Sequence, residues 1–268
     1  PAAPTGLTGV KGQALSTVSL TAHPGWSWVD NTAVMNTAGN QNFNANYHDA
    51  NGNYANGTNV SVSVNVLNKT NAGVTINGVP ASKTYGDADF TLTASAANMG
   101  TGTGAWTWSS SDSSVLSVAG TGANATVTIL KAGSATISAK YESNTTMDTK
   151  TTASITINKA TVTVAAKNQS IYVGGTVPSL TPPVKDTHYT VTGLVGSDTL
   201  VGTLAMKYQK AGVDATPTAA TTGTYDIVIS GVSEPDTTNY NPIVLTKGTL
   251  TISNPSHSGG GGGSYTPS

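Results

Sequence analysis

The chain has 268 residues and a formal net charge of −1 at pH 7; 37% of its residues are hydrophobic and only 9% are charged, against about 25% charged in an ordinary globular domain. It contains no cysteine, which excludes disulfides, thiolate metal sites and thiol nucleophiles. All twelve basic residues are lysines. A near-neutral chain without arginine is poorly suited to nucleic acid, because phosphate recognition depends on basic patches and guanidinium groups.

The amino-terminal stretch PAAPTGLTGV has neither a basic start nor an apolar run, as a signal peptide would. No window approaches the roughly 18 consecutive apolar residues of a membrane span. We therefore expect no signal peptide and no membrane-spanning segment in this chain, and we interpret its start as a cut through a larger precursor.

Short runs of alternating apolar and polar residues recur along the chain, beginning with Phe43–Tyr47 and Val60–Val66. No apolar stripe with helical spacing persists beyond about two turns. Such alternation, rich in β-branched residues and bounded by Gly, Asn, Asp or Pro, is typical of half-buried antiparallel strands. The sequence thus predicts an all-β protein. The same pattern predicts inward-facing residues at Val127, Ile129, Ala135, Ile137, Ala139, Tyr141, Val162, Val164, Tyr225, Ile227, Ile229, Leu250 and Ile252.

A similar closing strand appears three times, as VSVNVLNK at residues 62–69, ASITINK at 153–159 and GTLTISN at 248–254. Each is an alternating strand that runs into asparagine, and twice the asparagine is followed by lysine. The repeated ending divides the chain into blocks of a size at which a two-sheet sandwich closes a modest core. We expect the short connections at 68–71 and 158–160 to limit bending between blocks.

We predict three tandem immunoglobulin-like β-sandwich modules followed by a flexible tail. The tail contains five consecutive glycines, with serine and proline, which is the composition of a disordered linker. The predicted segments are a first block at residues 1–69, a second block at 70–158, a third block at 159–254 and a linker at 255–268.

The third block carries a family resemblance in Lys167–Gln169, in the GLVGSDTL run at 193–200, in Gly223–Tyr225 and in Gly248–Ile252. With these residues it resembles the MBG-type repeat of large secreted bacterial proteins. That repeat often has a Tyr-Gly pair after its first strand, where this chain has Tyr172-Val173-Gly174.

The second block resembles the bacterial immunoglobulin-like group 2 domain in Trp108–Asp112 and Lys131–Ile137. The first block, over 24–54, resembles a repeat found beside these two in the same surface proteins. The resemblances imply β-sandwich folds in extracellular tandem arrays of Gram-positive type, with a cell-wall anchor that lies outside this chain. The resemblances indicate very little about which ligand, if any, is bound, because the same modules occur in many host proteins.

Aromatic residues of the first block, beside the amides of Asn44, Asn46 and Asn53, are candidates for sugar binding. Residues i and i+2 of a strand share one face, so a Trp pair can form a flat platform. The alternative is that the pair packs inward, since a core with two phenylalanines needs other large apolar groups. For Trp106 and Trp108, the group 2 domain resemblance implies that Trp108 lies in the core, which brings Trp106 to the same side. The candidate ligand-binding residues are Trp26, Trp28, Tyr47 and Tyr54.

No catalytic set or cofactor site is predicted. Asp49–Asn53 has the alternating oxygens of a calcium loop, but Tyr54 and Val60 stand where an EF-hand requires glycine and a bidentate acid. Calcium is therefore a minor alternative. The two glutamates, Glu142 and Glu234, lie in different blocks, and the four histidines are scattered singly. Paired-carboxylate hydrolysis and metal-assisted chemistry both need groups set close together.

The sequence favours a non-catalytic spacer or stalk of a secreted, cell-wall-associated and adhesin-like bacterial protein, which would present a functional head away from the wall. We expect an elongated monomer. The alternative is a module that binds host or dietary glycan or mucin through the first block, and an enzyme is the least favoured hypothesis. A cell-surface protein is a further partner class, whereas nucleic acid and membrane are not expected partners.

Overall fold

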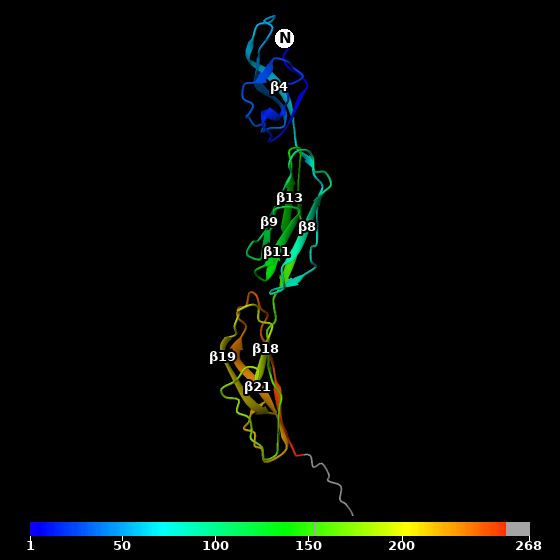
Figure 1. The fold of residues 1–268 in the computed structure, drawn as a ribbon. Coiled ribbons are helices and arrows are strands. Elements are labelled where there is room, and N and C mark those ends of the chain that lie inside the picture. Colours follow the sequence, from blue (N-terminus) through cyan, green and yellow to red (C-terminus); the bar gives the residue numbers. More distant parts are fainter. Residues whose placement is uncertain (153, 256–268) are drawn as a thin grey trace, which may run out of the picture. The chain divides into compact units, whose positions relative to one another are not determined.

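The computed structural model describes residues 1–152 and 154–255, so the predicted linker lies outside the described residues from residue 256 onwards. Strands provide nearly all of the regular structure (Figure 1). In the described part of the chain the helical structure is one 3-10 turn, η1 (Leu15–Thr17). The prediction of an all-β protein built from β-sandwich modules is confirmed.

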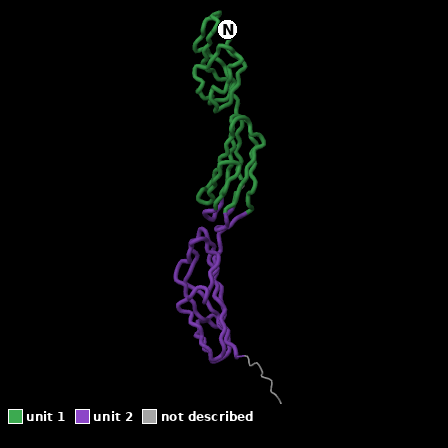
Figure 2. Tube along the Cα trace, in the orientation of Figure 1, with its two compact units in different colours: residues 1–81, 89–128, 135–155 green, residues 82–88, 129–134, 156–268 purple. Residues whose placement is uncertain are grey.

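The chain forms two compact units (Figure 2). Unit 1 contains residues 1–81, 89–128 and 135–155, and unit 2 contains residues 82–88, 129–134 and 156 onwards. This division passes through the second block, whose turn at 82–88 and loop at 129–134 belong with the third block. The three predicted block boundaries stay a prediction, and the block names are kept below as labels.

The first block forms one four-stranded sheet in unit 1, with irregular chain covering one face. Val62, Val64 and Val66 of its last strand are buried, which confirms their predicted alternation with serine and asparagine. Leu15 and Met35 of the irregular segments pack in the same cluster. The strand order is β1 (Leu7–Val10), β4 (Gly57–Leu67), β3 (Gly39–Tyr47) and β2 (Trp26–Trp28), with β1 parallel to β4 and the other pairs antiparallel.

The second block contributes two larger sheets with alternating burial. Leu92 and Val127 of one sheet, and Ile137 and Ala139 of the other, are fully buried. One sheet has the order β10 (Leu116–Ala119), β11 (Asn124–Ile129), β8 (Phe90–Ala96) and β6 (Val74–Asn77). The other has the order β5 (Thr70–Asn71), β14 (Thr146–Thr151), β13 (Ile137–Glu142) and β9 (Ala105–Ser110). A small sheet consists of β12 (Gly133–Ala135), β15 (Ile155–Asn158) and β7 (Lys83–Thr84).

The tryptophan pair of β9 faces the interior of the second block. Trp108 is 9% exposed, and its indole Nε1 donates to the carbonyl of Gly122 at 2.9 Å. Trp106 is half-buried, and its ring centroid lies 4.9 Å from that of Tyr141. Because the indole N–H has a backbone partner, Trp108 is buried without an unsatisfied donor.

The third block is a sandwich of two sheets in unit 2. Its core contains Val164 from one sheet and Ile227 and Leu250 from the other, all fully buried. These positions are among those predicted from alternation. The first sheet has the order β18 (Tyr189–Thr192), β16 (Thr163–Ala166) and β22 (Val244–Thr246). The second has the order β17 (Gln169–Tyr172), β23 (Gly248–Ser253), β21 (Gly223–Ser233), β19 (Val201–Lys210) and β20 (Val213–Asp214).

Candidate functional site

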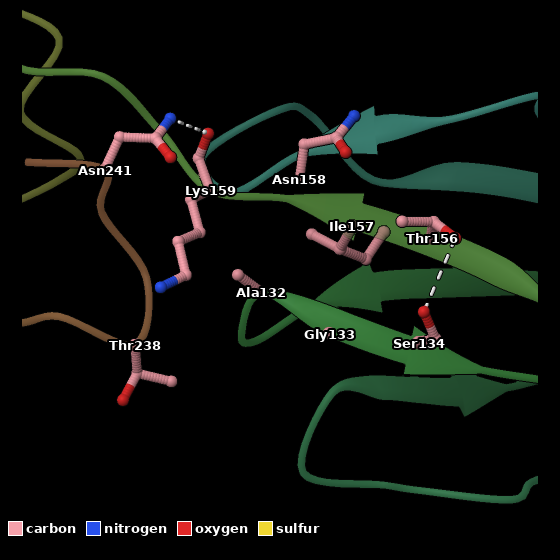
Figure 3. A pocket seen from close by; sticks show the side chains of 9 residues that line it. All are labelled: Ala132, Gly133, Ser134, Thr156, Ile157, Asn158, Lys159, Thr238 and Asn241. Atoms are coloured by element: carbon pink, nitrogen blue, oxygen red, sulfur yellow. Dashed lines mark hydrogen bonds between the residues drawn. The ribbon is translucent and has the colours of Figure 1, made fainter.

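A cleft of about 760 Å³ lies in unit 2. Its lining has hydroxyl, amide and ammonium groups beside the apolar side chains of Ala132 and Ile157 (Figure 3). Three separated stretches of chain form it: the β12 region, the end of β15 and the loop before β22. The lining residues are Ala132, Gly133, Ser134, Thr156, Ile157, Asn158, Lys159, Thr238 and Asn241.

Several polar groups of this cleft are already bonded to neighbours within unit 2. The ammonium of Lys159 donates to the carbonyl of Thr237 at 2.6 Å. The amide of Asn241 donates to the Lys159 carbonyl at 3.3 Å and to the Thr161 hydroxyl at 3.0 Å. The lining residues include no Asp, Glu or His. The cleft can therefore hydrogen-bond a polar group, but its lining offers no nucleophile paired with a base.

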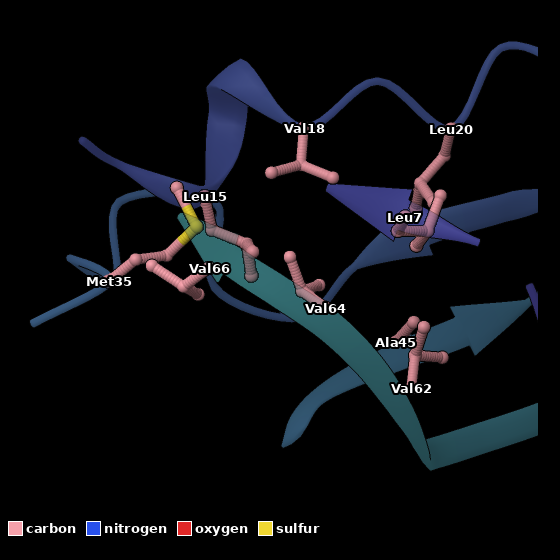
Figure 4. Packing of buried hydrophobic residues seen from close by; sticks show 9 residues of the cluster. All are labelled: Leu7, Leu15, Val18, Leu20, Met35, Ala45, Val62, Val64 and Val66. Atoms are coloured by element: carbon pink, nitrogen blue, oxygen red, sulfur yellow. The ribbon is translucent and has the colours of Figure 1, made fainter. Parts of the chain in front are cut away.

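Two of the four predicted aromatic residues of the first block, Trp26 and Trp28, pack against its core. Trp26 pairs with Tyr47 across β2 and β3, and Trp28 pairs with Ala45, which is fully buried. Both tryptophans therefore share the face that carries the buried valines shown in Figure 4. Trp28 donates from its Nε1 to the carbonyl of Val18 at 2.9 Å. Each tryptophan is half-buried, so one part of each ring is packed and another part meets solvent.

The structure brings Trp26 and Tyr47 together, with ring centroids 5.5 Å apart. Gly25 makes this approach possible: its φ is +83°, and a Cβ there would lie 2.6 Å from the His48 carbonyl oxygen and 2.8 Å from the Tyr47 ring. The pKa of the Tyr47 hydroxyl is raised mainly by burial and to a smaller extent by the nearby charge of Asp49. Tyr54 lies on the loop after β3 and is 62% exposed. Three of the four candidates thus lie on strands, and the fourth lies on a loop.

The candidate calcium loop is organised by backbone donors to one carboxylate. Asp49 accepts from the amide of Asn51 at 3.0 Å and from the amide of Tyr54 at 2.6 Å. These hydrogen bonds lower the pKa of Asp49, and the bond from the Asn51 amide has the largest effect. Within residues 1–152 and 154–255, no group of three or more His, Cys, Asp or Glu is placed to hold a metal ion. Calcium binding here stays an untested minor alternative to the prediction of no cofactor.

Sequence reasoning missed a buried polar cluster in unit 2. Tyr240 is 1% exposed, and its hydroxyl donates to Asp198 Oδ2 at 2.6 Å. The same hydroxyl accepts from the amide of Val195 at 3.0 Å. The pKa of Tyr240 is raised to about 12, mainly by burial and to a smaller extent by the hydrogen bond to Asp198. The one available signal was Asp198 itself, which belongs to the GLVGSDTL run.

The lysines that follow two of the closing strands also have defined partners. Lys69 donates to Glu142 Oε1 at 2.6 Å and to the carbonyl of Ser143 at 2.8 Å. Lys140 contacts the other oxygen of Glu142 at 2.5 Å. Bonds from Lys140 and then Lys69 lower the pKa of Glu142. Lys159 bonds a loop carbonyl of the third block in a comparable way. The repeated Asn-Lys ending therefore places an ammonium at the start of each following block.

Comparisons with known proteins give one family match. Residues 162–251 match the family described as MBG domain (YGX type), which agrees with the resemblance of the third block. A search of curated protein sequences found no match.

Solved structures with similar chain folds include a surface layer protein, a phage capsid protein and titin. Domains 1–6 of the surface layer protein SbsC are 15% identical, with 94% of this chain and 39% of that chain covered and a TM-score of 0.31. The three N-terminal domains of the bacteriophage RB49 Hoc protein are 12% identical, with coverages of 86% and 88% and a TM-score of 0.27. The I9–I11 tandem from titin is 11% identical, with coverages of 92% and 96% and a TM-score of 0.26.

The chain spans well under half the length of the surface layer protein fragment that it matches. In the part of the chain that the structure describes, no helix has the length and apolar character needed to cross a membrane.

Proposed function

We propose that this chain is a non-catalytic segment of a secreted bacterial cell-surface protein, and that it acts as a spacer which presents a functional head away from the cell wall. The MBG match of residues 162–251 supports a cell-surface module. In this proposal the second block is a bacterial immunoglobulin-like group 2 domain, the first block is a companion repeat, and the anchor lies outside this chain. The segment works as a monomer outside the cell.

The observation that carries the proposal is the bonding at the block connections. Lys69 joins the end of β4 to Glu142 and Ser143, and β5, directly after it, pairs with β14. Lys159 joins the end of β15 to the Thr237 carbonyl. A spacer needs connections that resist bending, whereas an enzyme needs converging reactive groups in a cavity. The lining of the unit 2 cleft contains no Asp, Glu or His.

Small-angle X-ray scattering of the full chain tests the spacer function. A single compact domain of this length has a radius of gyration of about 18 Å. A spacer must keep its ends apart, so we expect a clearly larger radius and a monomer mass at every concentration. A radius near the compact value, or a mass that rises with concentration, would contradict the proposal.

Glycan binding by the first block is the second candidate. The observation that favours it is the exposed Tyr54 on the loop after β3, which interacts electrostatically with the half-buried Tyr47, whose ring lies against that of Trp26. Its chemistry would be stacking of a neutral sugar ring on an aromatic face, with asparagine amides as donors.

A glycan array probed with the full chain and with Tyr54→Ala decides between the two. Binding that disappears in Tyr54→Ala but persists in Tyr172→Ala, a matched exposed tyrosine of the third block, supports the glycan hypothesis. No binding by the unaltered chain removes it. The packing of Trp28 against Val18 makes Trp28→Ala unsuitable, because that variant also loses core contacts.

A further inference from the structure

One turn recurs once in each block, always at the same place. β1, β7 and β17 each run parallel to the closing strand of their block, β4, β15 and β23 respectively. Each then enters a turn whose third residue is a glycine with positive φ: +86° at Gly12, +91° at Gly86 and +86° at Gly174. Positive φ is the region that favours glycine. The three turns are Val10–Gln13, Thr84–Asp87 and Tyr172–Gly175.

The hydrogen bonds of the three turns are also the same. The residue before the glycine donates its amide to the closing strand, in the bonds Lys11 to Leu67, Tyr85 to Asn158 and Val173 to Ser253, each at 2.9 Å. The residue after the glycine closes the turn, in the bonds Gln13 to Val10 at 3.1 Å, Asp87 to Thr84 at 2.9 Å and Gly175 to Tyr172 at 2.9 Å. The three turns therefore share the same backbone conformation at the glycine and the same two backbone hydrogen bonds.

The surroundings of the three glycines differ. A Cβ built on Gly12 or Gly174 would meet no atom within 4 Å. A Cβ on Gly86 would lie 2.4 Å from Cγ2 and 3.0 Å from Cγ1 of Val195. Side chains do not approach so closely, so Val195 occupies the space that any other residue at position 86 would need. Among the three turn glycines, Gly86 alone lies directly against a side chain of another block.

The residue before Gly86 makes the second part of this contact. The Tyr85 ring meets the Tyr240 ring edge to face, with centroids 5.6 Å apart and an interplanar angle of 84°. Tyr85 also packs against the buried cluster of Ala160, Val162 and Tyr240. Its hydroxyl donates to Asp198 Oδ2 at 3.5 Å, beside the shorter bond from Tyr240. Lys11 and Val173 stand at the equivalent positions of the other two turns.

We propose that the Thr84–Asp87 turn is a docking element and that Val195, Asp198 and Tyr240 form its receptor surface on the third block. The receptor selects an aromatic residue followed by glycine: the aromatic ring contacts Tyr240, its hydroxyl meets the Asp198 carboxylate, and the bare Cα fits beside Val195. Turns with lysine or valine before the glycine lack the ring and are not accepted. The inference deepens the proposed spacer function, on which its biological meaning rests, by identifying a specific connection.

Three matched substitutions in the full chain test the docking. Gly12→Ala, Gly86→Ala and Gly174→Ala place the same methyl group at nearly the same φ, so the backbone penalty is common to all three. The readout is amide hydrogen exchange, by NMR, at Val195 and at Ala132, whose amide donates at 2.9 Å to Oδ1 of Asn239, the residue before Tyr240. We expect roughly tenfold faster exchange at both amides in Gly86→Ala, and no change there in the two controls.

Rescue by a second substitution distinguishes a steric clash with Val195 from a general loss of stability. In Gly86→Ala with Val195→Ala, both clashing methyl groups are removed, so exchange at Ala132 returns toward the rate in Val195→Ala alone. Tyr85→Val, which copies the turn of the third block, gives a second readout if Gly86→Ala does not fold; it is expected to speed exchange at Val195.

Equal responses of the three glycine variants, or unchanged exchange in Tyr85→Val, would overturn the docking proposal. Either result would leave the scattering test of the spacer function untouched, so the two proposals fail separately.

Discussion

Tyr240 illustrates how a single side chain links stability to pH. Its buried hydroxyl donates to Asp198 and accepts from Val195, and its pKa is raised from 10.0 to about 12. A tyrosine with a raised folded-state pKa contributes stability that is complete below the unfolded pKa. That contribution is lost as the pH rises through the folded value, because the unfolded chain releases its proton first.

We therefore expect the free energy of unfolding to fall between about pH 10 and pH 12, and this fall to be reduced in Tyr240→Phe. The measurement is urea unfolding across the alkaline range, with tyrosinate absorbance followed in parallel. Tyr54→Phe, which alters an exposed tyrosine, is the control and should keep the full alkaline decrease. An identical alkaline profile for Tyr240→Phe and the unaltered chain would contradict the assignment.

Lys69 provides a second test at the residue scale. Its side chain is 13% exposed and bonds both Glu142 and the Ser143 carbonyl. Lys69→Met is expected to lower the free energy of unfolding by roughly 1 kcal/mol, since a partly buried charged hydrogen bond is lost. It should also raise the pKa of Glu142 toward the ordinary value, as measured by NMR titration of the carboxyl group.

Lys140→Met is the matched control, because Lys140 contacts the same carboxylate but is 41% exposed. It should raise the pKa of Glu142 while changing stability less. Since the pKa of Glu142 is lowered in the folded chain, its contribution is present above the ordinary carboxyl pKa of 4.5 and is lost as the pH falls through the folded value. Lys69→Met should reduce this acid sensitivity, and equal stability losses for both variants would argue against a special role for Lys69.

At the scale of the element, each strand has one face for the core and one for water. In β21, Ile227 is fully buried between neighbours on β19 and β23, while Asp226 lies on the opposite face and pairs with Lys247 at 3.0 Å. A slip of one residue would exchange these faces, so burial on one side keeps the register.

Ile227→Ala removes most of a side chain from the third-block core. We expect a loss of roughly 2–5 kcal/mol in the free energy of unfolding, from lost burial and the cavity left behind. Val213→Ala, at a side chain that is 70% exposed on β20, should stay within about 0.5 kcal/mol of the unaltered chain. Urea titration measures both, and similar losses for the two variants would mean that Ile227 is not a core residue in solution.

At the scale of the whole molecule, charge contributes little. The net charge is −1, and the ion pairs between side chains of the described residues include Lys69–Glu142, Lys140–Glu142, Lys207–Asp214 and Lys247–Asp226. Their partners are mostly exposed, and exposed pairs are weak and screened by salt. Burial of aliphatic side chains is therefore the main stabilising contribution.

It follows that salt should change the stability of the chain very little. Raising the sodium chloride concentration from roughly 0.05 to 0.5 M is expected to shift the melting temperature by less than about 2 °C, because that range screens most exposed ion pairs. Differential scanning calorimetry is the measurement. A decrease in melting temperature well beyond about 2 °C would show that the lysine ion pairs stabilise the chain more than exposed pairs are expected to.

The sequence by itself determined the class of fold and most of the buried strand positions. Strand alternation is a local property, so Val62, Val64, Ile137 and Ile227 could be assigned to the interior without knowing their partners. The MBG-type resemblance of the third block could likewise be recognised, and the family match over 162–251 agrees with it.

Only the tertiary structure decided which of three similar turns is docked. Val10–Gln13, Thr84–Asp87 and Tyr172–Gly175 share little beyond one glycine, so no sequence comparison within the chain selects one of them. The choice depends on Tyr85 meeting Tyr240 and on Gly86 meeting Val195. These contacts join residues more than a hundred positions apart, and the local pattern around each residue contains no information about its distant partner.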